Sequence, residues 1–405
     1  MSEKVVYMDN NATTRVAPEV LEAMLPYLSD LYGNPSSMHS FGGQVGKGLT
    51  LAREQIAALI GASPDELIFT SCGTESDSTA ILSALQSFPE KRHIVTTRVE
   101  HPAVKNLCES IDKLTGHKHK VTQLPVSREG VLDLTQYEES LTDETAIVSV
   151  MWANNETGVI FPITEMAEIA KSRGILFHTD AVQAVGKIPI DLNNVPIDFL
   201  SISGHKLHAS KGIGVLYVRR GKPFVPFMVG GHQEHGRRGG TENVAAIIGL
   251  GKACELAGEN LQDENTRVKA MRDKLENDLL ETIPSSMLNG HRTDRLPNTT
   301  NISFEYVEGE AILLHMDRYG ICASSGSACT SGSLEPSHVL RAMGVPFTAA
   351  HGSIRFSLSV YNSEDEIDFV LDKMPPIIEN LRAMSPFWKR EHPGKVGSSQ
   401  CKCSC

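Results

Sequence analysis

The chain has 405 residues, 40% of them hydrophobic, which is the composition of a globular protein large enough for two domains. Its formal net charge of −11 argues against a nucleic-acid-binding surface, which needs a basic footprint, although local basic patches stay open. The opening segment MSEKVVYMDNNATT has no apolar signal core, and no later run approaches the roughly 18 apolar residues of a membrane span, so we expect a cytoplasmic protein.

Short apolar runs alternate with helical patterns between Glu66 and Val218. This alternation predicts an α/β fold with a mostly parallel sheet that is covered on both faces. Polar residues at the carboxyl ends of such strands are the expected place for a ligand. The runs are ELIFTS, HIVTT, KVTQLPV, TAIVSVMW, GILFHTD, DFLSISG and GVLYV.

The turn SCGTES follows the first of these runs and opens a helical pattern. Gly73 and Thr74 lie between strand and helix, with Glu75 and Ser76 in the first turn. Free backbone amides at a helix start favour an anion such as a cofactor phosphate. The alternative is a simple N-cap formed by Thr74.

His101 precedes a helix that starts with proline, in the segment RVEHPAV. An imidazole there could stack on a cofactor ring and shuttle protons, or it could be a hydrogen-bonded structural group.

Asp180 ends the run GILFHTD, and Lys206 follows the run DFLSISG. Both residues are expected at one edge of the sheet. Pyridoxal phosphate needs a lysine amine to form a Schiff base and a carboxylate to keep its ring nitrogen protonated. The alternative is that both side chains are simply solvated.

A long helical stretch from Glu242 to about Ile283 could link to a second unit. We therefore expect a large α/β domain over 15–260 and a small α+β domain over 1–14 and 261–386. Residues 387–405 are polar and are expected to be a disordered tail.

The segment SSGSACTSGS, residues 324–333, places Cys329 among small and polar residues. Such a segment buries too little to offset its ordering entropy, so we expect a mobile loop that carries one thiol. The other cysteines are read as reduced thiols, since a chain of this length needs no disulfide staples. Three of them, Cys401, Cys403 and Cys405, alternate in the tail and could bind a soft metal or take up sulfur.

Taken together, these segments resemble the cysteine desulfurases of the class V aminotransferase family, in particular the nitrogen-fixation (NifS-like) type, with the housekeeping type as close kin. The resemblance runs from Tyr7 to about Pro386 and implies the type I aminotransferase fold and a homodimer. It lends no support to a role for the tail cysteines. The matching motifs are YMDNNATT, GNPSSMHSFG, SCGTES, EHPAV, NNETG, HTDAVQ, SGHKLHASKGIGVLY, GGTEN and SSGSACTSGS.

The resemblance implies a role for each candidate residue. Lys206 would carry pyridoxal 5'-phosphate, Asp180 would pair with the ring nitrogen, and His101 would stack on the ring and move protons. Arg355 would bind the substrate carboxylate, since a guanidinium offers a planar two-pronged match to it. Asn34 would help to shape the substrate entrance. The remaining cofactor contacts would come from Gly73, Thr74, Asn155 (also toward substrate), Gln183, Ser203, His205 and, from the partner subunit, Thr241.

The resemblance also implies the reaction. L-cysteine would be converted to L-alanine, and its sulfur would move to Cys329 as a persulfide and then to an iron–sulfur scaffold protein (NifU/IscU-like), with nitrogenase clusters as the expected destination. Cys329 could in addition act as a transient iron–sulfur ligand. Three alternatives stay open at this point: a selenocysteine lyase, another class V aminotransferase or lyase, and a non-enzymatic sulfur carrier or scaffold.

Overall fold

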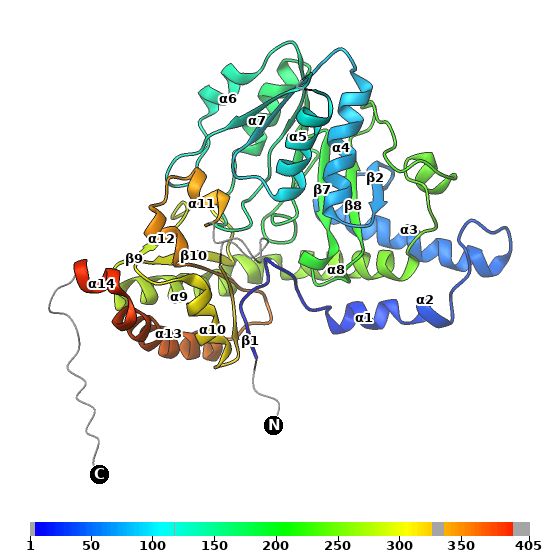
Figure 1. Cartoon of the computed structure of the whole chain (residues 1–405). Helices are drawn as coiled ribbons and strands as arrows, with labels where there is room; N and C mark the ends of the chain where they lie inside the picture. The colour runs from blue at the N-terminus through cyan, green and yellow to red at the C-terminus, as the bar shows by residue number, and fades with distance from the viewer. Residues whose placement is uncertain (1–4, 117, 326–335, 392–405) are drawn as a thin grey trace.

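The computed structural model describes residues 5–116, 118–325 and 336–391, which form an α/β architecture around one large sheet (Figure 1). The seven strands lie in the order β2-β8-β7-β6-β5-β3-β4. They are β2 (Leu67–Thr70), β3 (His93–Thr97), β4 (Lys120–Leu124), β5 (Thr145–Ser149), β6 (Leu176–Asp180), β7 (Phe199–Ser203) and β8 (Gly214–Val218).

Strands β4, β3, β5, β6 and β7 pair in parallel, whereas β8 is antiparallel to both β7 and β2. Six of the seven are buried along nearly their whole length, which is why their sequences are continuous apolar runs rather than alternating patterns. The predicted mostly parallel α/β sheet is confirmed.

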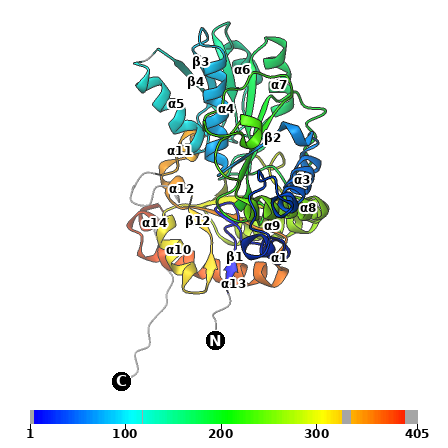
Figure 2. The ribbon, with the colours of Figure 1, turned by 90° about the vertical axis from the view of Figure 1, so that its right-hand side faces the viewer.

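Helices cover both faces of this sheet. The helices α4 (Gly73–Ser87) and α5 (Pro102–Leu114) share one hydrophobic cluster with it. On the other face a larger cluster includes α3 (Ser40–Ile60), α7 (Ile163–Ser172) and α8 (Val244–Asp263). Figure 2 shows α5 and α7 on opposite sides of the strands.

A smaller antiparallel sheet has the order β12-β13-β10-β9, from β9 (Ser286–Leu288), β10 (Thr299–Phe304), β12 (Ser324–Ser325) and β13 (Ser353–Ser357). Its own hydrophobic cluster includes α9 (Lys269–Thr282), α10 (Gly309–Asp317) and α13 (Glu364–Met384). The amino-terminal strand β1 (Val6–Tyr7) pairs in parallel with β11 (Ile321–Cys322) of this part of the molecule. The chain therefore begins beside the small sheet and crosses to the large one.

One long helical rod joins the two parts. It comprises α8, a π-helical turn (Glu264–Val268) and α9, so the predicted domain boundary near residue 260 falls inside continuous helix. The shorter helical elements are α1 (Pro18–Met24), α2 (Pro26–Ser29), η1 (Pro64–Glu66), α6 (Leu134–Ser140), η2 (Gly204–Lys206), η3 (Gln233–Gly236), α11 (His338–Ala342), α12 (Phe347–His351) and α14 (Pro386–Glu391).

The start of the predicted disordered tail needs a correction, because residues 387–391 belong to α14. The Trp388 ring lies 5.7 Å from the Tyr306 ring and 4.4 Å from the Arg382 guanidinium carbon. These contacts hold the helix against the small part of the molecule. The rest of the tail, 392–405, lies outside the described residues. Within the described ranges no helix has the length and apolar character to span a membrane.

Candidate active site

Lys206 lies one short turn beyond β7, at the carboxyl end of a buried strand. Its Nζ donates to the carbonyl of Ala12 at 2.7 Å and also to the carbonyl of Asn11. The neighbouring strand β6 ends at Asp180, which is paired with Ser201 in the sheet. The two predicted residues are thus brought to one edge of the sheet, as parallel strand ends require.

Asp180 and His101 influence each other electrostatically. Asp180 is only 7% exposed and accepts a 2.9 Å hydrogen bond from the Val182 amide. Burial raises its pKa, which His101 and Lys206 oppose. For His101, burial lowers the pKa, Asp180 counteracts this, and Lys206 adds to it. The imidazole is therefore neutral at neutral pH.

The tautomer of His101 follows from its position before α5. Its Nδ1 accepts a 3.2 Å hydrogen bond from the Ala103 amide. Because Nδ1 acts as an acceptor, the single proton of the neutral ring is assigned to Nε2.

Two further buried carboxyls lie behind Asp180, and the sequence reasoning did not find them. Burial, and next the charge of Asp180, raise the pKa of Asp77 well above its ordinary value. Burial raises the pKa of Glu100 to about 8. Glu100 accepts from the Thr97 hydroxyl at 2.7 Å and from the Met151 amide at 3.1 Å. Both carboxyls therefore tend to keep their protons.

Asp180 is the carboxyl with the most support for a negative charge. Oδ1 of Asp77 has no hydrogen-bond partner and lies 3.5 Å from Nε2 of His178. Burial lowers the pKa of His178 to about 3, so that ring stays neutral and offers no countercharge. Asp180, by contrast, accepts from the Val182 amide and has the charge of Lys206 nearby, both of which lower its pKa. Of these three carboxyls, Asp180 at the sheet edge is therefore the one whose ionised form is best stabilised.

The turn before α4 has the properties of an anion site. Its N-cap is Cys72, which makes no side-chain capping bond, so the alternative of a cap by Thr74 does not hold. A Cβ on Gly73 would lie 3.0 Å from Val182 and 3.4 Å from Ser203, which places this backbone against the end of β7. First-turn amides without a side-chain cap suit a phosphate.

The charge of Glu75, in the same first turn, is compensated. Arg238 donates to it from Nε at 2.9 Å and from Nη2 at 3.1 Å, and the Ser71 amide donates at 2.7 Å. Burial acts to raise the pKa of Glu75, but these hydrogen bonds lower it below its ordinary value. The carboxylate is therefore satisfied within the protein rather than left to repel an anion.

The other predicted phosphate contacts divide into two groups. Ser203 ends β7, and His205 follows it with Nδ1 at 3.2 Å from the Thr13 hydroxyl. Burial, with a contribution from Lys206, lowers the pKa of His205 to about 4, so its imidazole is neutral. Thr241 is exposed in the segment before α8, and no hydrogen bond within the described ranges joins it to Thr74, Ser203 or His205.

Arg355 lies in β13, between β10 and β12, and is 5% exposed. Its Nη1 donates to the Asn155 carbonyl at 3.0 Å and its Nη2 to Asp9 Oδ1 at 2.7 Å. Gln183 donates to the Asn11 carbonyl at 3.1 Å, and the same oxygen also accepts a hydrogen bond from Lys206 Nζ. Arg355, Asn155, Gln183 and Lys206 are thus joined through the amino-terminal segment.

Asn34 is not drawn into this group. Its side chain is exposed and accepts from the Ser36 amide at 2.9 Å, which forms a local turn. This explains the residue without any substrate contact.

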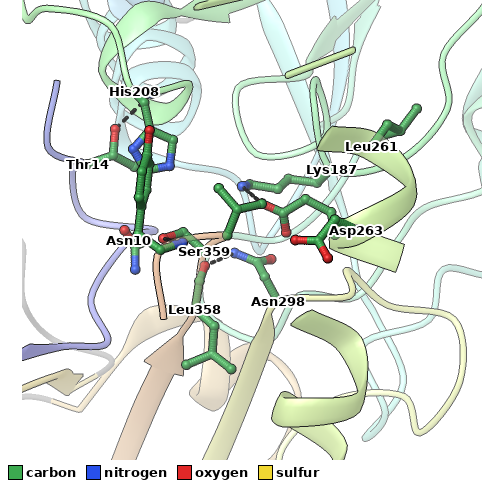
Figure 3. A network of polar contacts seen from close by, with 12 residues as sticks. Asn10, Thr14, Lys187, His208, Leu261, Asp263, Asn298, Leu358 and Ser359 are labelled. Carbon is green, nitrogen blue, oxygen red and sulfur yellow. Dashed lines mark hydrogen bonds and ion pairs between the residues drawn. The ribbon is translucent and has the colours of Figure 1, made fainter. Parts of the chain in front are cut away.

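The amino-terminal segment 9–14 is the functional element that the sequence reasoning missed. The side chain of Asn11 donates to the Thr299 hydroxyl at 2.9 Å and to the Asn155 carbonyl at 3.2 Å. The backbone carbonyl of Asn11 accepts hydrogen bonds from Lys206 and Gln183. Figure 3 shows the next contacts of this segment, including Thr14 beside His208, whose amide donates to the Thr14 hydroxyl at 2.9 Å. The motif YMDNNATT was a signal of family membership but carried no assigned role.

Four of the eight cysteines lie within the described residues and four lie outside them. Cys329, Cys401, Cys403 and Cys405 lie outside the described residues, as does most of the predicted loop. Burial raises the pKa of both Cys108 and Cys254 to about 12, which keeps these thiols protonated and unreactive. No cluster of His, Cys, Asp or Glu suited to a metal ion occurs among the residues that the structure describes.

The donor set fits pyridoxal phosphate. An amine, a buried carboxyl and a neutral imidazole meet at one sheet edge, beside a helix start whose amides have no side-chain cap. Together these residues match the aldehyde, ring nitrogen, ring face and phosphate of that cofactor.

The family model described as aminotransferase class-V matches residues 6–370. A cysteine desulfurase of Trichormus azollae is 61% identical over 383 residues, which is 95% of each chain. Cysteine desulfurase NifS of Azotobacter vinelandii is 60% identical over 396 residues, covering 96% of this chain and 98% of that one. A solved structure titled NifS-like protein has a TM-score of 0.87 and 38% identity over 93% of this chain and all of its own. The predicted family is thereby confirmed, and the chain belongs to the class-V aminotransferases.

Proposed function

We propose that this protein is a pyridoxal-phosphate-dependent cysteine desulfurase that converts L-cysteine to L-alanine and receives the sulfur on Cys329. The observation that carries the proposal is the meeting of Lys206, Asp180 and His101 at the sheet edge. The buried cation of Arg355 is linked to this edge by hydrogen bonds through Asn155 and Asn11. Relatives about 60% identical over nearly the whole chain are named cysteine desulfurases, which supports this function over a selenocysteine lyase or a sulfur carrier.

Lys206 would anchor the cofactor through its amine, and Asp180 would hold a proton at the ring nitrogen. The turn of Gly73 and Thr74, with Ser203 and His205, would bind the phosphate. Asn155 and Gln183 would contact the ring substituents. Bound pyridoxal phosphate supplies an electron sink that weakens bonds near the substrate α-carbon.

The chain's own groups would then orient the substrate and move protons. Arg355 would hold the α-carboxylate of L-cysteine. The Lys206 amine would also serve as a proton acceptor for the α-position, and the carbonyls of Asn11 and Ala12, which accept from Nζ, would stabilise the protonated amine that results. His101, neutral and carrying its proton on Nε2, presents that N–H as a donor; to take up a proton it would use Nδ1, which first has to release the Ala103 amide.

Sulfur transfer would use the thiolate of Cys329 as nucleophile. It attacks the substrate sulfur, a sulfur–sulfur bond forms, and the carbon–sulfur bond of cysteine breaks. A proton takes the place of sulfur on the substrate carbon, so cysteine and one enzyme thiol yield alanine and one enzyme persulfide. A thiol with an ordinary pKa near 8.5 is only a few per cent ionised at neutral pH, so a base is needed, and the candidate is Nδ1 of His101 once it has released the Ala103 amide.

We further propose a homodimer in which Thr241 completes the phosphate site of the partner subunit. Large apolar side chains are exposed on α1, on α2 and in the segment before α8, which is unusual for a free surface and supports burial by a second copy. They include Leu21, Leu25, Leu28, Tyr32, Phe227 and Val229. The exposure of Thr241 agrees with a role outside its own subunit.

The destination of the sulfur is also part of the proposal. An iron–sulfur scaffold protein in the cytoplasm would accept it, with nitrogenase-type clusters as the product. This rests on the nitrogen-fixation name of one relative, Azotobacter NifS. Cys401, Cys403 and Cys405 could assist in sulfur handling, and Cys329 could serve as a transient iron–sulfur ligand.

The test is the product of L-cysteine. Purified protein with pyridoxal phosphate and a reductant should release alanine and sulfide in equal amounts over many turnovers. A keto acid with amination of the cofactor would instead indicate an aminotransferase. Persulfide uptake without any alanine would indicate a carrier.

A further inference from the structure

Arg355 is a buried cation that already has a counter-ion within the protein. Its side chain is 6% exposed, and its Nη2 lies 2.7 Å from Oδ1 of Asp9, whose side chain is 17% exposed. Asp9 is held in place because its backbone forms a β-bridge to Ser357, two residues along from Arg355. An isolated buried charge is strongly disfavoured, so Asp9 stabilises the guanidinium when no ligand is present.

The guanidinium still has unused donors. Of its five N–H groups, one on Nη1 goes to the Asn155 carbonyl and one on Nη2 goes to Asp9. The Nε–H is buried and has no hydrogen-bond partner among the residues that the structure describes. A buried donor without an acceptor is costly, so this arrangement favours the arrival of a further acceptor, and a carboxylate can take Nε and Nη2 together.

We infer that Asp9 is a specificity-determining residue that weakens carboxylate binding at Arg355 by acting as its resident counter-ion. The inference rests on the proposed role of Arg355 toward the substrate carboxylate. A ligand carboxylate has to share the guanidinium with Asp9, and two like charges beside one cation repel each other. Asp9 thereby keeps the amino acid and its product from being held too tightly.

The other groups near this pair do not replace Asp9. Tyr7 and Cys322 lie close enough to be influenced by it. Burial, followed by Asp9, raises the pKa of Tyr7 to about 12, so the phenol is neutral. For Cys322, burial and then Asp317 and Asp9 raise the pKa, so this thiol is also neutral. The charge of Arg355 also acts on the buried carboxyl of Glu156, whose pKa burial raises to about 7. Among the described residues, the carboxylate in an ion pair with Arg355 is that of Asp9.

The experiment compares two small probes as competitive inhibitors of the holoenzyme: propanoate, a carboxylate, and propanamide, its neutral isostere. Asp9→Asn keeps an oxygen that can accept from Nη2 but removes the charge. The inhibition constant for propanoate should fall about tenfold or more, equivalent to about 1.4 kcal/mol, while that for propanamide stays unchanged. Asp317→Asn removes a nearby exposed charge that does not contact Arg355 and should leave both constants as in the wild type.

Arg355→Gln distinguishes a failure of the substrate role of Arg355 from a failure of the inference about Asp9. If it weakens propanoate binding and Asp9→Asn does not strengthen it, Arg355 keeps its role and the inference about Asp9 is overturned. If Arg355→Gln leaves propanoate binding unchanged, the substrate role of Arg355 fails, and the inference fails with it. A purely structural Asp9 would change both probes alike, which also contradicts the inference.

Stability provides a second, independent readout. Asp9→Asn leaves Arg355 without its counter-ion and should lower the melting temperature, and the double variant Asp9→Asn/Arg355→Gln should recover part of that loss. If Asp9→Asn does not fold, Asp9→Ser removes the same charge with less bulk and takes its place in the inhibition assay. Equal melting temperatures for Asp9→Asn and the wild type would contradict the counter-ion role.

Discussion

The two halves of the site are built in different ways. Asp180 is the last residue of one strand of the large sheet, Lys206 and His101 each follow another, and the parallel topology brings these strand ends together. Arg355 comes from the small sheet and reaches its partners, Asp9 and the Asn155 carbonyl, across 346 and 200 residues of sequence. The first half depends on local strand ends, whereas the second depends on how three distant segments meet.

This difference separates chemistry from recognition. The strand-end half supplies the amine, carboxyl and imidazole that a cofactor needs. The half around Arg355 supplies a cation, its counter-ion Asp9 and the Asn155 carbonyl, an arrangement suited to binding a carboxylate. Variants in the first half should abolish the reaction, and variants around the second should change affinity.

The largest effect is expected at Lys206. Lys206→Ala should lose covalent attachment of pyridoxal phosphate and nearly all alanine formation, because the Lys206 amine is the one held by the Asn11 and Ala12 carbonyls at that sheet edge. Borohydride reduction followed by peptide mass analysis measures the attachment. Cofactor fixed to the variant chain at another lysine, with activity retained, would contradict the assignment.

The next largest effect is expected at Cys329. Cys329→Ser should bind cofactor and substrate normally but lose alanine production by several orders of magnitude, because a serine hydroxyl hardly ionises and cannot form a persulfide. Alanine released per cofactor in the presence of a reductant is the measurement. Cys254→Ser is the control, since it should lose stability while its chemistry is kept.

A third effect concerns the buried carboxyls behind Asp180. Burial raises the pKa of Glu100 from about 4.5 to about 8, so the folded state binds this proton more tightly than the unfolded chain does. The stability gained from it is complete below the unfolded pKa and is lost as the pH rises through 8. In Glu100→Gln, the free energy of unfolding should therefore decrease less than in the wild type as the pH rises from about 4.5 to about 8.

Urea unfolding at a series of pH values measures this change. Glu165→Gln, an exposed carboxyl on α7, is the control and should keep the wild-type profile. An unaltered slope in Glu100→Gln would show that Glu100 is ionised in the folded protein.

The smallest effect is expected at Arg238, which compensates Glu75 in the anion-binding turn. Arg238→Gln should weaken pyridoxal phosphate about tenfold, or about 1.4 kcal/mol, because an unpaired Glu75 carboxylate repels the phosphate. Fluorescence titration of the apoprotein measures this affinity, with pyridoxal as the ligand that lacks the phosphate. Glu75→Gln combined with Arg238→Gln should restore binding, and failure to do so would exclude a charge effect.

Much of the first half was predictable from sequence. The apolar runs gave the sheet, and Asp180 and Lys206 at their ends gave the cofactor chemistry. The helix start at Gly73 was predicted as well, although not the fact that its N-cap is Cys72 with no side-chain bond; its role toward a phosphate stays a prediction.

The second half was not predictable in the same way. Asp9 and Asn11 look like turn residues, and their roles arise only when the amino-terminal segment lies between the two sheets. Asp77 and Glu100 are polar residues in otherwise ordinary helix and loop patterns, and their raised pKa values come from burial by segments distant in sequence. Local patterns carry no information about such contacts.

The central claim is that the cofactor end of the large sheet and the thiol of Cys329 act in one reaction. The direct measurement is to incubate the holoenzyme with L-cysteine without reductant and to quantify both alanine and the mass of the peptide that contains Cys329. We predict one added sulfur atom on that peptide for each alanine released in the first turnover. Alanine formation with an unmodified Cys329, or an added sulfur on another cysteine instead, would contradict the claim.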